Sequence, residues 1–227
     1  MQRVPVLDPR GVPVIGNDAH LPAVGAERLS AAALRQRFLA PPAWQVEFPG
    51  DGRLIDREPA DASVLVPLVM RGGDLSVLLT QRTDHLHDHA GQISFPGGRA
   101  EPHDDDAIAT ALRETEEEVG LPRHHIEIIG QLPTYTTVTN FVVTPVVALI
   151  EPGFTVQPDP FEVAEVFEVP LAFLMNPTHH QRHAIDWSGG RREFYSMPWR
   201  PQPQAPDYFI WGATAAMLRN FYRFLSA

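Results

Sequence analysis

The stretch GGRAEPHDDDAIATALRETEEEVGL, residues 97–121, decides the fold because it contains one well-delimited helix with four glutamates at its end. The three aspartates at 104–106 can cap and charge the first turn, and Gly120 followed by Pro122 supplies a stop. Glutamates in the last turn lie at the negative end of the helix dipole, which costs about 0.3–1 kcal/mol for each charge. They also repel one another, which costs about 0.2–0.5 kcal/mol for each like-charged pair. This unfavourable placement indicates that the carboxylates have a function.

The four glutamates do not share one face of the helix. On a helical wheel, Glu114, Glu117 and Glu118 fall within one arc, whereas Glu116 points to the other side. A neighbouring arc is expected to face the core, and it consists of Ile108, Ala111, Leu112, Thr115 and Val119. The three convergent carboxylates offer the hard oxygen ligands that Mg²⁺ or Mn²⁺ prefers.

Two neighbouring features favour a metal site over the alternative, a solvated acidic helix end. Arg113 stands beside the glutamates, and its planar guanidinium can hydrogen-bond a carboxylate and hold it in one rotamer. The turn FPGG at residues 95–98 follows an apolar strand, and its glycines let the backbone approach a ligand closely.

The run RETEEEVGL at residues 113–121, behind the Gly-Gly turn, resembles the signature of the Nudix hydrolases, G-x5-E-x7-R-E-U-x-E-E-x-G-U with U apolar. The second half matches at every charged position and at Gly120, and Thr115 replaces one apolar residue. In the first half, Asp105 takes the leading acid position and Gly98 lies one residue further away than usual. Asp105 itself is interpreted as a helix cap rather than a ligand.

A second string resembles one branch of this family, the coenzyme A pyrophosphatases. LLTQRT at residues 78–83, Gly91 and FPGG at 95–98 follow the branch motif L-L-T-x-R-[ST]-x3-R-x3-G-x3-F-P-G-G in spacing. His87 stands where that motif has its second arginine. A neutral histidine is a weaker and pH-dependent partner for phosphate, so the match to coenzyme A is imperfect at this position. The resemblance extends over residues 60–225.

The resemblance implies an α/β fold, namely a Nudix-type α/β/α sandwich with a mixed central sheet. It also implies hydrolysis of the diphosphate linkage of coenzyme A or its acyl derivatives to 3′,5′-ADP and 4′-phosphopantetheine. One alternative is a Nudix hydrolase for another nucleoside diphosphate derivative, such as ADP-ribose or a dinucleoside polyphosphate. The other is a binding module that has lost catalysis, which is less favoured because Arg113 and the three glutamates are present.

The resemblance further implies roles for individual residues. The expected catalytic residues are Arg113, Glu114 and Glu117, and the expected ligands of Mg²⁺ or Mn²⁺ are Glu114, Glu117, Glu118 and the carbonyl of Gly98. Substrate is expected to contact Arg82, His87 and Gly97. A further acid lies on a later loop, and Glu162 and Glu165 remain equal candidates for it.

Length and composition bound the remaining organisation. The chain has 227 residues, no cysteine and a net charge of −10, so disulfides and thiolate chemistry are excluded and nucleic-acid binding is not expected. No apolar run approaches the roughly 18 residues of a membrane span, and the first residues lack a signal-peptide core, so we expect a cytoplasmic protein without membrane contact. The expected partner is a small nucleotide. The proline-rich leader and residues 198–206 are candidates for a homodimer contact or a cover over the cleft.

We expect an N-terminal extension at residues 1–60, partly irregular with one short helix at 29–39, followed by a Nudix domain at 61–227. The expected strands are 62–70, 75–81, 126–132, 141–150 and 163–169, and the expected final helix is 207–225. Two histidine groups are weighed as zinc ligands, at 85, 87 and 89 and at 179, 180 and 183. Neither has a cysteine or a closed spacing of four ligands, so a zinc site is not favoured.

Overall fold

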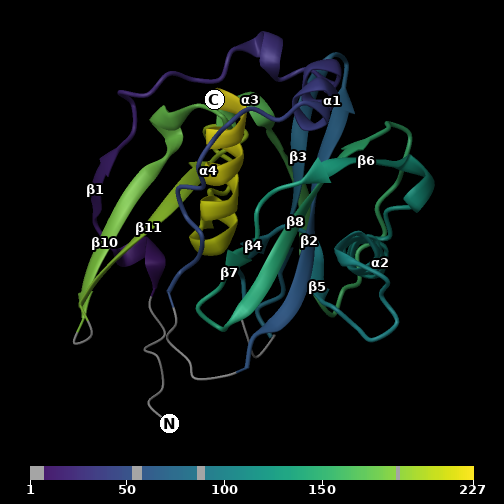
Figure 1. Cartoon of the computed structure of the whole chain (residues 1–227). Helices are drawn as coiled ribbons and strands as arrows, with labels where there is room; N and C mark the ends of the chain where they lie inside the picture. Colours follow the sequence, from purple (N-terminus) through teal and green to yellow (C-terminus); the bar gives the residue numbers. More distant parts are fainter. Residues whose placement is uncertain (1–7, 53–57, 86–89, 188–189) are drawn as a thin grey trace.

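The computed structural model of the protein describes residues 8–52, 58–85, 90–187 and 190–227 (Figure 1). The α-helices are α1 (Ala31–Leu39), α2 (Ala107–Val119), α3 (Leu171–Leu174) and α4 (Gly212–Ser226). The strands are β1 (Val14–Asn17), β2 (Ala60–Arg71), β3 (Asp74–Arg82), β4 (Ile93–Ser94), β5 (Gly97–Arg99), β6 (Ile126–Gln131), β7 (Tyr135–Thr136), β8 (Phe141–Ile150), β9 (Val163–Pro170), β10 (Gln181–Trp187), β11 (Gly190–Trp199) and β12 (Tyr208–Trp211). No helix within the described ranges has the length and hydropathy to cross a bilayer.

The larger sheet is mixed, as the sequence predicts. Its strands run in the order β4-β3-β2-β8-β6, while β5 pairs with β2, β7 with β8 and β9 with β3. The central pair, β2 and β8, is parallel from Ala60 opposite Phe141 to Val69 opposite Ile150. The other pairings in this sheet are antiparallel.

Successive side chains of β2 and β8 point to opposite faces of this sheet, and both faces are buried. One face packs on α2 in a cluster that includes Leu65, Val69, Ala111, Val119, Val146, Ala148 and Ile150. The other face belongs to a larger cluster with α4, which includes Val66, Leu68, Val147, Leu149, Leu218 and Phe221. The sheet is therefore held between α2 and α4, which fixes the acidic end of α2 against the ends of β2 and β5.

A second, four-stranded sheet with the order β1-β10-β11-β12 lies beyond α4 (Figure 1). The sequence did not predict this layer. It also corrects the expected final helix, because residues 208–211 form β12 and α4 begins only at Gly212. Gly212 has φ +60°, a left-handed conformation that separates the strand from the helix.

The N-terminal segment is part of the same core rather than an appendage. Helix α1 begins at Ala31 with Ser30 as its cap, two residues later than predicted, and Leu34 is fully buried. The buried carboxylate of Asp18 accepts a hydrogen bond from the hydroxyl of Tyr195 at 2.8 Å and pairs with Arg219 of α4 at 3.1 Å. A buried ion pair of this kind ties the segment to α4, because neither charge can be left alone in the core.

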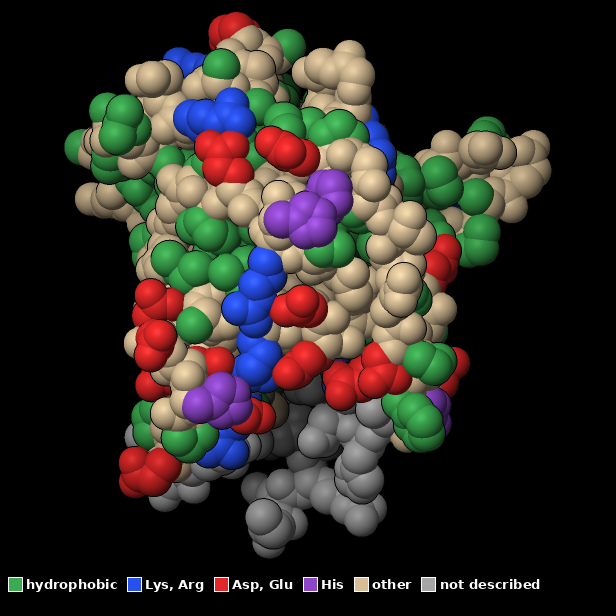
Figure 2. Space-filling model, turned by 90° about the vertical axis from the view of Figure 1, so that its right-hand side faces the viewer, with side chains coloured by type: hydrophobic (Ala, Val, Ile, Leu, Met, Phe, Trp, Pro, Cys, Tyr) green, Lys and Arg blue, Asp and Glu red, His purple; other side chains and the backbone are tan. Residues whose placement is uncertain are grey.

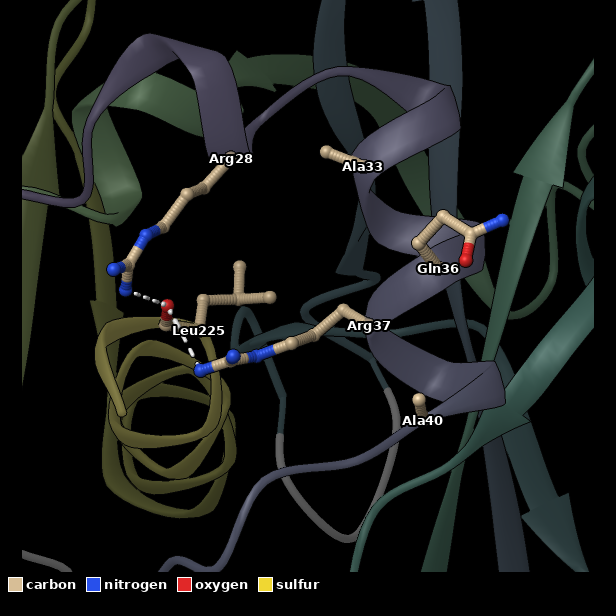
Figure 3. A pocket seen from close by; sticks show the side chains of 6 residues that line it. All are labelled: Arg28, Ala33, Gln36, Arg37, Ala40 and Leu225. Atoms are coloured by element: carbon tan, nitrogen blue, oxygen red, sulfur yellow. Dashed lines mark hydrogen bonds between the residues drawn. The ribbon is translucent and has the colours of Figure 1, made fainter.

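The segment also caps the C-terminal end of α4 (Figure 3). Figure 3 shows Arg28 and Arg37 both donating to the carbonyl of Leu225, at 3.2 and 3.4 Å, where the helix leaves its carbonyls unpaired. Arg37 also donates to the carbonyl of Phe224 at 2.8 Å. Burial, and secondarily Arg28, lower the pKa of Arg37. The two arginines border a pocket of about 350 Å³, which contains none of the predicted site residues.

Candidate functional site

Helix α2 begins where the backbone and one side chain provide a cap. Asp106 is extended, with φ −160°, and its Oδ1 accepts a hydrogen bond from the backbone N–H of Ala109 at 2.8 Å. The interpretation of Asp105 as the cap is wrong, because a cap must directly precede the first helical residue, and Asp105 is exposed. The helix ends at Gly120, whose φ of +65° is the left-handed conformation of a C-terminal cap.

The aspartate that matters for the site is Asp104, which sequence reasoning treated only as part of the cap. Its two oxygens accept hydrogen bonds from Nε and Nη2 of Arg113 at 3.0 and 2.8 Å, and from Thr110 Oγ1 at 3.0 Å. Arg113 holds the pKa of Asp104 well below its usual range. Three consecutive aspartates before a helix carry no signal in the sequence that would identify the first of them as the partner of Arg113.

Arg113 joins this loop to the glutamates. Its Nη1 donates to Glu114 Oε1 at 2.8 Å and to Glu117 Oε2 at 3.1 Å, and its Nη2 donates to the carbonyl of Arg99 at 3.1 Å. The side chain is only 12% exposed, so these contacts lie largely out of water. The guanidinium thereby sets the positions of two of the predicted metal ligands.

The backbone of Gly97 and Gly98 lies directly against the carboxylates of Glu118 and Glu114. Gly97 has φ +152°, and a Cβ there would lie 2.3 Å from the carbonyl oxygen of Ser63. A Cβ on Gly98 would lie 2.5 Å from the carboxylate of Glu114. The backbone N–H of Gly97 donates to Glu118 Oε2 at 3.1 Å. Only glycine allows this approach, so the turn and α2 form one unit.

Glu118 is the most buried of the helix glutamates, with 5% of its side chain exposed. Burial raises its pKa to about 7, and the negative charges of Glu162 and Glu114 add to the increase, while the N–H of Gly97 and the Arg82 guanidinium oppose it. Burial also raises the pKa of Glu114. The site therefore concentrates negative charge where water stabilises it poorly, which favours a bound cation.

Arg82 faces this charge from the end of β3. Its Nη1 lies 3.6 Å from Glu118 Oε1, and its Nε is buried without a hydrogen-bond partner among the described residues. A buried donor that lacks a partner is uncommon in folded proteins. Arg82 thus keeps hydrogen-bonding capacity for an anion beside the carboxylates.

The loop after β8 binds the C-terminal end of α2, and the two candidate loop acids that follow it have different surroundings. The backbone N–H groups of Gln157 and Asp159 donate to the last carbonyls of the helix, at Val119 and Glu118. The loop continues to Glu162, whose charge acts on Glu114 and Glu118. Glu165 instead accepts a hydrogen bond from the hydroxyl of Tyr208 at 2.6 Å.

The acidic face that carries α2 is shown in Figure 2, where Asp and Glu side chains gather around a few basic ones. Glu117 is 61% exposed, and Glu116 pairs with Arg123 at 2.9 Å, away from the other three glutamates. The oxygen donors of Glu114, Glu117, Glu118 and the Gly98 backbone suit a hard divalent cation. Within the described ranges, no three acidic or histidine side chains surround a common metal position. The carboxylates of Glu114 and Glu117 accept hydrogen bonds from Arg113, and that of Glu118 accepts one from Gly97.

Among the described residues the histidines form no group that could hold a metal ion. Among the first group, His87 and His89 lie outside the described residues, and His85 is exposed. In the second group, His180 Nε2 lies 2.7 Å from the carbonyl of Leu174, and His183 Nε2 lies 2.8 Å from Ser196 Oγ. These ring nitrogens are therefore occupied by hydrogen bonds within the core.

A mixed sheet between two helices, with arginine-held glutamates under a Gly-Gly turn, defines the Nudix class of fold and site. A model of the NUDIX domain matches residues 59–187. The chain is 35% identical over 177 residues to an uncharacterized Nudix hydrolase NudL of Photorhabdus laumondii, covering 78% of this chain and 91% of the relative. It is 43% identical over 160 residues to the NudL of Escherichia coli strain K12, covering 70% and 79%. The chain belongs to the Nudix hydrolase family.

Solved structures are more distant. A Caenorhabditis elegans Ap4A hydrolase binary complex shares 23% identity with a TM-score of 0.41, covering 48% of this chain and 80% of that chain. At this level of similarity the comparison bears on neither substrate nor mechanism.

The raised pKa of Glu118 predicts a pH-dependent effect of its substitution in metal-free protein. The folded state binds this proton more tightly than the unfolded state, so wild-type stability falls as pH rises from about 4.5 to about 7. Glu118→Gln removes this loss and should increase the free energy of unfolding above pH 7 by on the order of 2 kcal/mol. The advantage should vanish near pH 4.5. Urea denaturation in the presence of a chelator, at several pH values, measures this difference in the free energy of unfolding between the variant and the wild type.

Glu116→Gln is the matched control, because Glu116 is half exposed and lies on the other side of the helix. It should show no comparable pH dependence. A Glu118→Gln variant that is less stable than the wild type at pH 8 without metal would contradict the assignment.

Proposed function

We propose that this Nudix hydrolase cleaves the diphosphate linkage of coenzyme A or its acyl derivatives and releases 3′,5′-ADP and (acyl-)4′-phosphopantetheine. The family assignment supports the broader statement, a hydrolase of nucleoside diphosphate derivatives. The observation that carries the reaction type is the group of carboxylates that Arg113 and Gly97 hold beside Arg82. The substrate rests on the coenzyme A string at residues 78–98.

The proposed ligands of Mg²⁺ or Mn²⁺ are Glu114, Glu117, Glu118 and the carbonyl of Gly98. Such an ion, when bound, neutralises charge on the diphosphate and increases the acidity of water. The burial of Glu118, the exposure of Glu117 and the absence of a side chain at Gly98 support this set, because they combine fixed oxygens with an open approach.

The chain's own residues have separate parts in the proposal. Arg113, expected from the sequence to be catalytic, is assigned a positioning role, because its N–H groups are engaged by Asp104, Glu114 and Glu117. Arg82 is assigned to the diphosphate, since its side chain is 25% exposed beside Glu118 and a guanidinium can donate two hydrogen bonds to a phosphate. Gly97 stays a proposed substrate contact because its backbone lies beside Glu118.

Glu162 is proposed as the loop acid that accepts a proton from the attacking water. The choice is supported by the negative charge of Glu162, which contributes to the raised pKa of Glu114 and of Glu118, whereas Glu165 accepts a hydrogen bond from Tyr208.

A second candidate substrate class follows from His87. Because this position departs from the arginine of the coenzyme A motif, another nucleoside diphosphate derivative such as ADP-ribose remains the alternative.

A substrate panel tests the proposal directly. With Mg²⁺, the protein should cleave coenzyme A and acetyl-coenzyme A faster than ADP-ribose, NADH or diadenosine tetraphosphate, and chromatography should show 3′,5′-ADP. Glu117→Gln should lower kcat by at least about 100-fold, since even partners of metal ligands contribute about 10–100-fold. Rapid cleavage of ADP-ribose with no cleavage of coenzyme A or its thioester would sink the substrate assignment.

The two loop acids provide a matched pair. Glu162→Gln should lower kcat on the best substrate of the panel by about 100-fold, in the range of general-base catalysis, whereas Glu165→Gln should leave it within about twofold. Equal losses in both variants would refute the assignment of the base.

Metal binding should stabilise the fold. Saturation with Mg²⁺ at 100 times its dissociation constant adds about 2.7 kcal/mol, which should raise Tm by several degrees. Glu117→Gln should reduce this increment, whereas Glu116→Gln should preserve it, because Glu116 pairs with Arg123 instead. Thermal melts across a Mg²⁺ titration measure both, and an increment that is the same in Glu117→Gln and wild type would count against the proposed ligand set.

A further inference from the structure

Phe161 is an exposed aromatic residue at the edge of the proposed site. Its side chain is 75% exposed, although Phe is usually buried. Of the described large hydrophobic residues, Leu39 is comparably exposed at 78%, and it lies at the end of α1. The fold gains little from the Phe161 ring in this position, so the ring is available to a ligand.

The backbone under this ring is anchored. The N–H of Phe161 donates to Asp159 Oδ1 at 2.8 Å, and its carbonyl accepts a hydrogen bond from Thr83 Oγ1 at 2.8 Å. The N–H of Thr83 donates to the carbonyl of Glu162 at 3.0 Å. Thr83 is buried and directly follows Arg82, so the backbone of Phe161 is held at a fixed place relative to that arginine.

A second ring lies beside the first. The centroid of the His85 ring is 6.2 Å from that of Phe161, and the two planes meet at 85°. This edge-to-face arrangement is a preferred geometry for aromatic pairs and steadies the Phe161 ring. Because His85 approaches as a perpendicular neighbour and the Phe161 side chain remains mostly exposed, surface is left for a planar group.

The position of the Phe161 ring relative to Arg82 indicates which planar part of the substrate it contacts. Thr83 binds the carbonyls of both Phe161 and Glu162, and Arg82, which directly precedes Thr83, lies 3.6 Å from Glu118. In a nucleoside diphosphate the base is one ribose away from the phosphates. We infer that Phe161, with His85 at its edge, forms a stacking platform for the heteroaromatic base of the nucleotide substrate. This inference rests on the proposed function in placing the diphosphate at Arg82.

Stacking on one ring recognises a base by its π-face rather than by hydrogen bonds. Such contacts tolerate different bases, so the platform contributes affinity for nucleotides as a class. It is a binding contribution, separate from the carboxylates that act on the diphosphate.

Equilibrium binding of two probes tests the inference without turnover. Calorimetry with ADP and with inorganic pyrophosphate, both with Mg²⁺, compares ligands with and without a base. Phe161→Ala should weaken ADP binding roughly tenfold, the range expected for loss of one stacked base, and leave pyrophosphate binding unchanged. Phe161→Trp should retain ADP affinity, because it keeps a stacking surface.

Leu39→Ala is the matched control, because it removes an equally exposed apolar side chain elsewhere and should change neither affinity. Unchanged Tm in Phe161→Ala should confirm that the fold is intact. Equal weakening of ADP and pyrophosphate, unaltered ADP binding in Phe161→Ala, or no ADP binding by the wild type would each overturn the inference. Failure of the coenzyme A assay together with Phe161-dependent ADP binding would overturn only the substrate assignment.

Discussion

The site depends on the hydrogen bonds between Arg113 and Asp104. A bidentate arginine–aspartate pair gives both groups a fixed orientation, and at this partly buried position water competes weakly for them. The remaining N–H groups of the arginine can then hold Glu114 and Glu117 on α2. Without this cation, carboxylates in consecutive turns would repel one another at the negative end of the helix dipole.

The same helix organises the chain that follows it. Its apolar arc is buried against β2 and β8, which fixes its depth, and its last carbonyls accept hydrogen bonds from the loop at residues 157–159. This loop then continues to Phe161 and Glu162. The end of α2 therefore sets both its own acids and the position of a loop that is distant in sequence, so one structural unit holds the proposed metal ligands, base and stacking ring.

The sequence predicted the regular elements that have strong hydrophobic patterns. Strand β8 has the predicted bounds, β2 and β3 extend the predicted ranges by one or two residues, and α2 was placed correctly. The second sheet was missed because β10, QRHAIDW, mixes charged and apolar residues, and β1 has only four residues. These two strands pair with each other, and β10 also pairs with β11, which packs on α4; local sequence pattern does not express such contacts.

The sequence by itself determined the family, the mixed sheet and the helix with its conspicuous acids, because these follow from residue type and short-range spacing. Only the tertiary structure decided which partner each of several neighbouring acids contacts. Asp104 rather than Asp105 meets Arg113, and Tyr208 engages Glu165, whereas the charge of Glu162 contributes to the raised pKa of Glu118. The reason is physical: burial and long-range hydrogen bonds select among residues that have the same local chemistry, and these contacts exist only once the sheet and α2 have packed together.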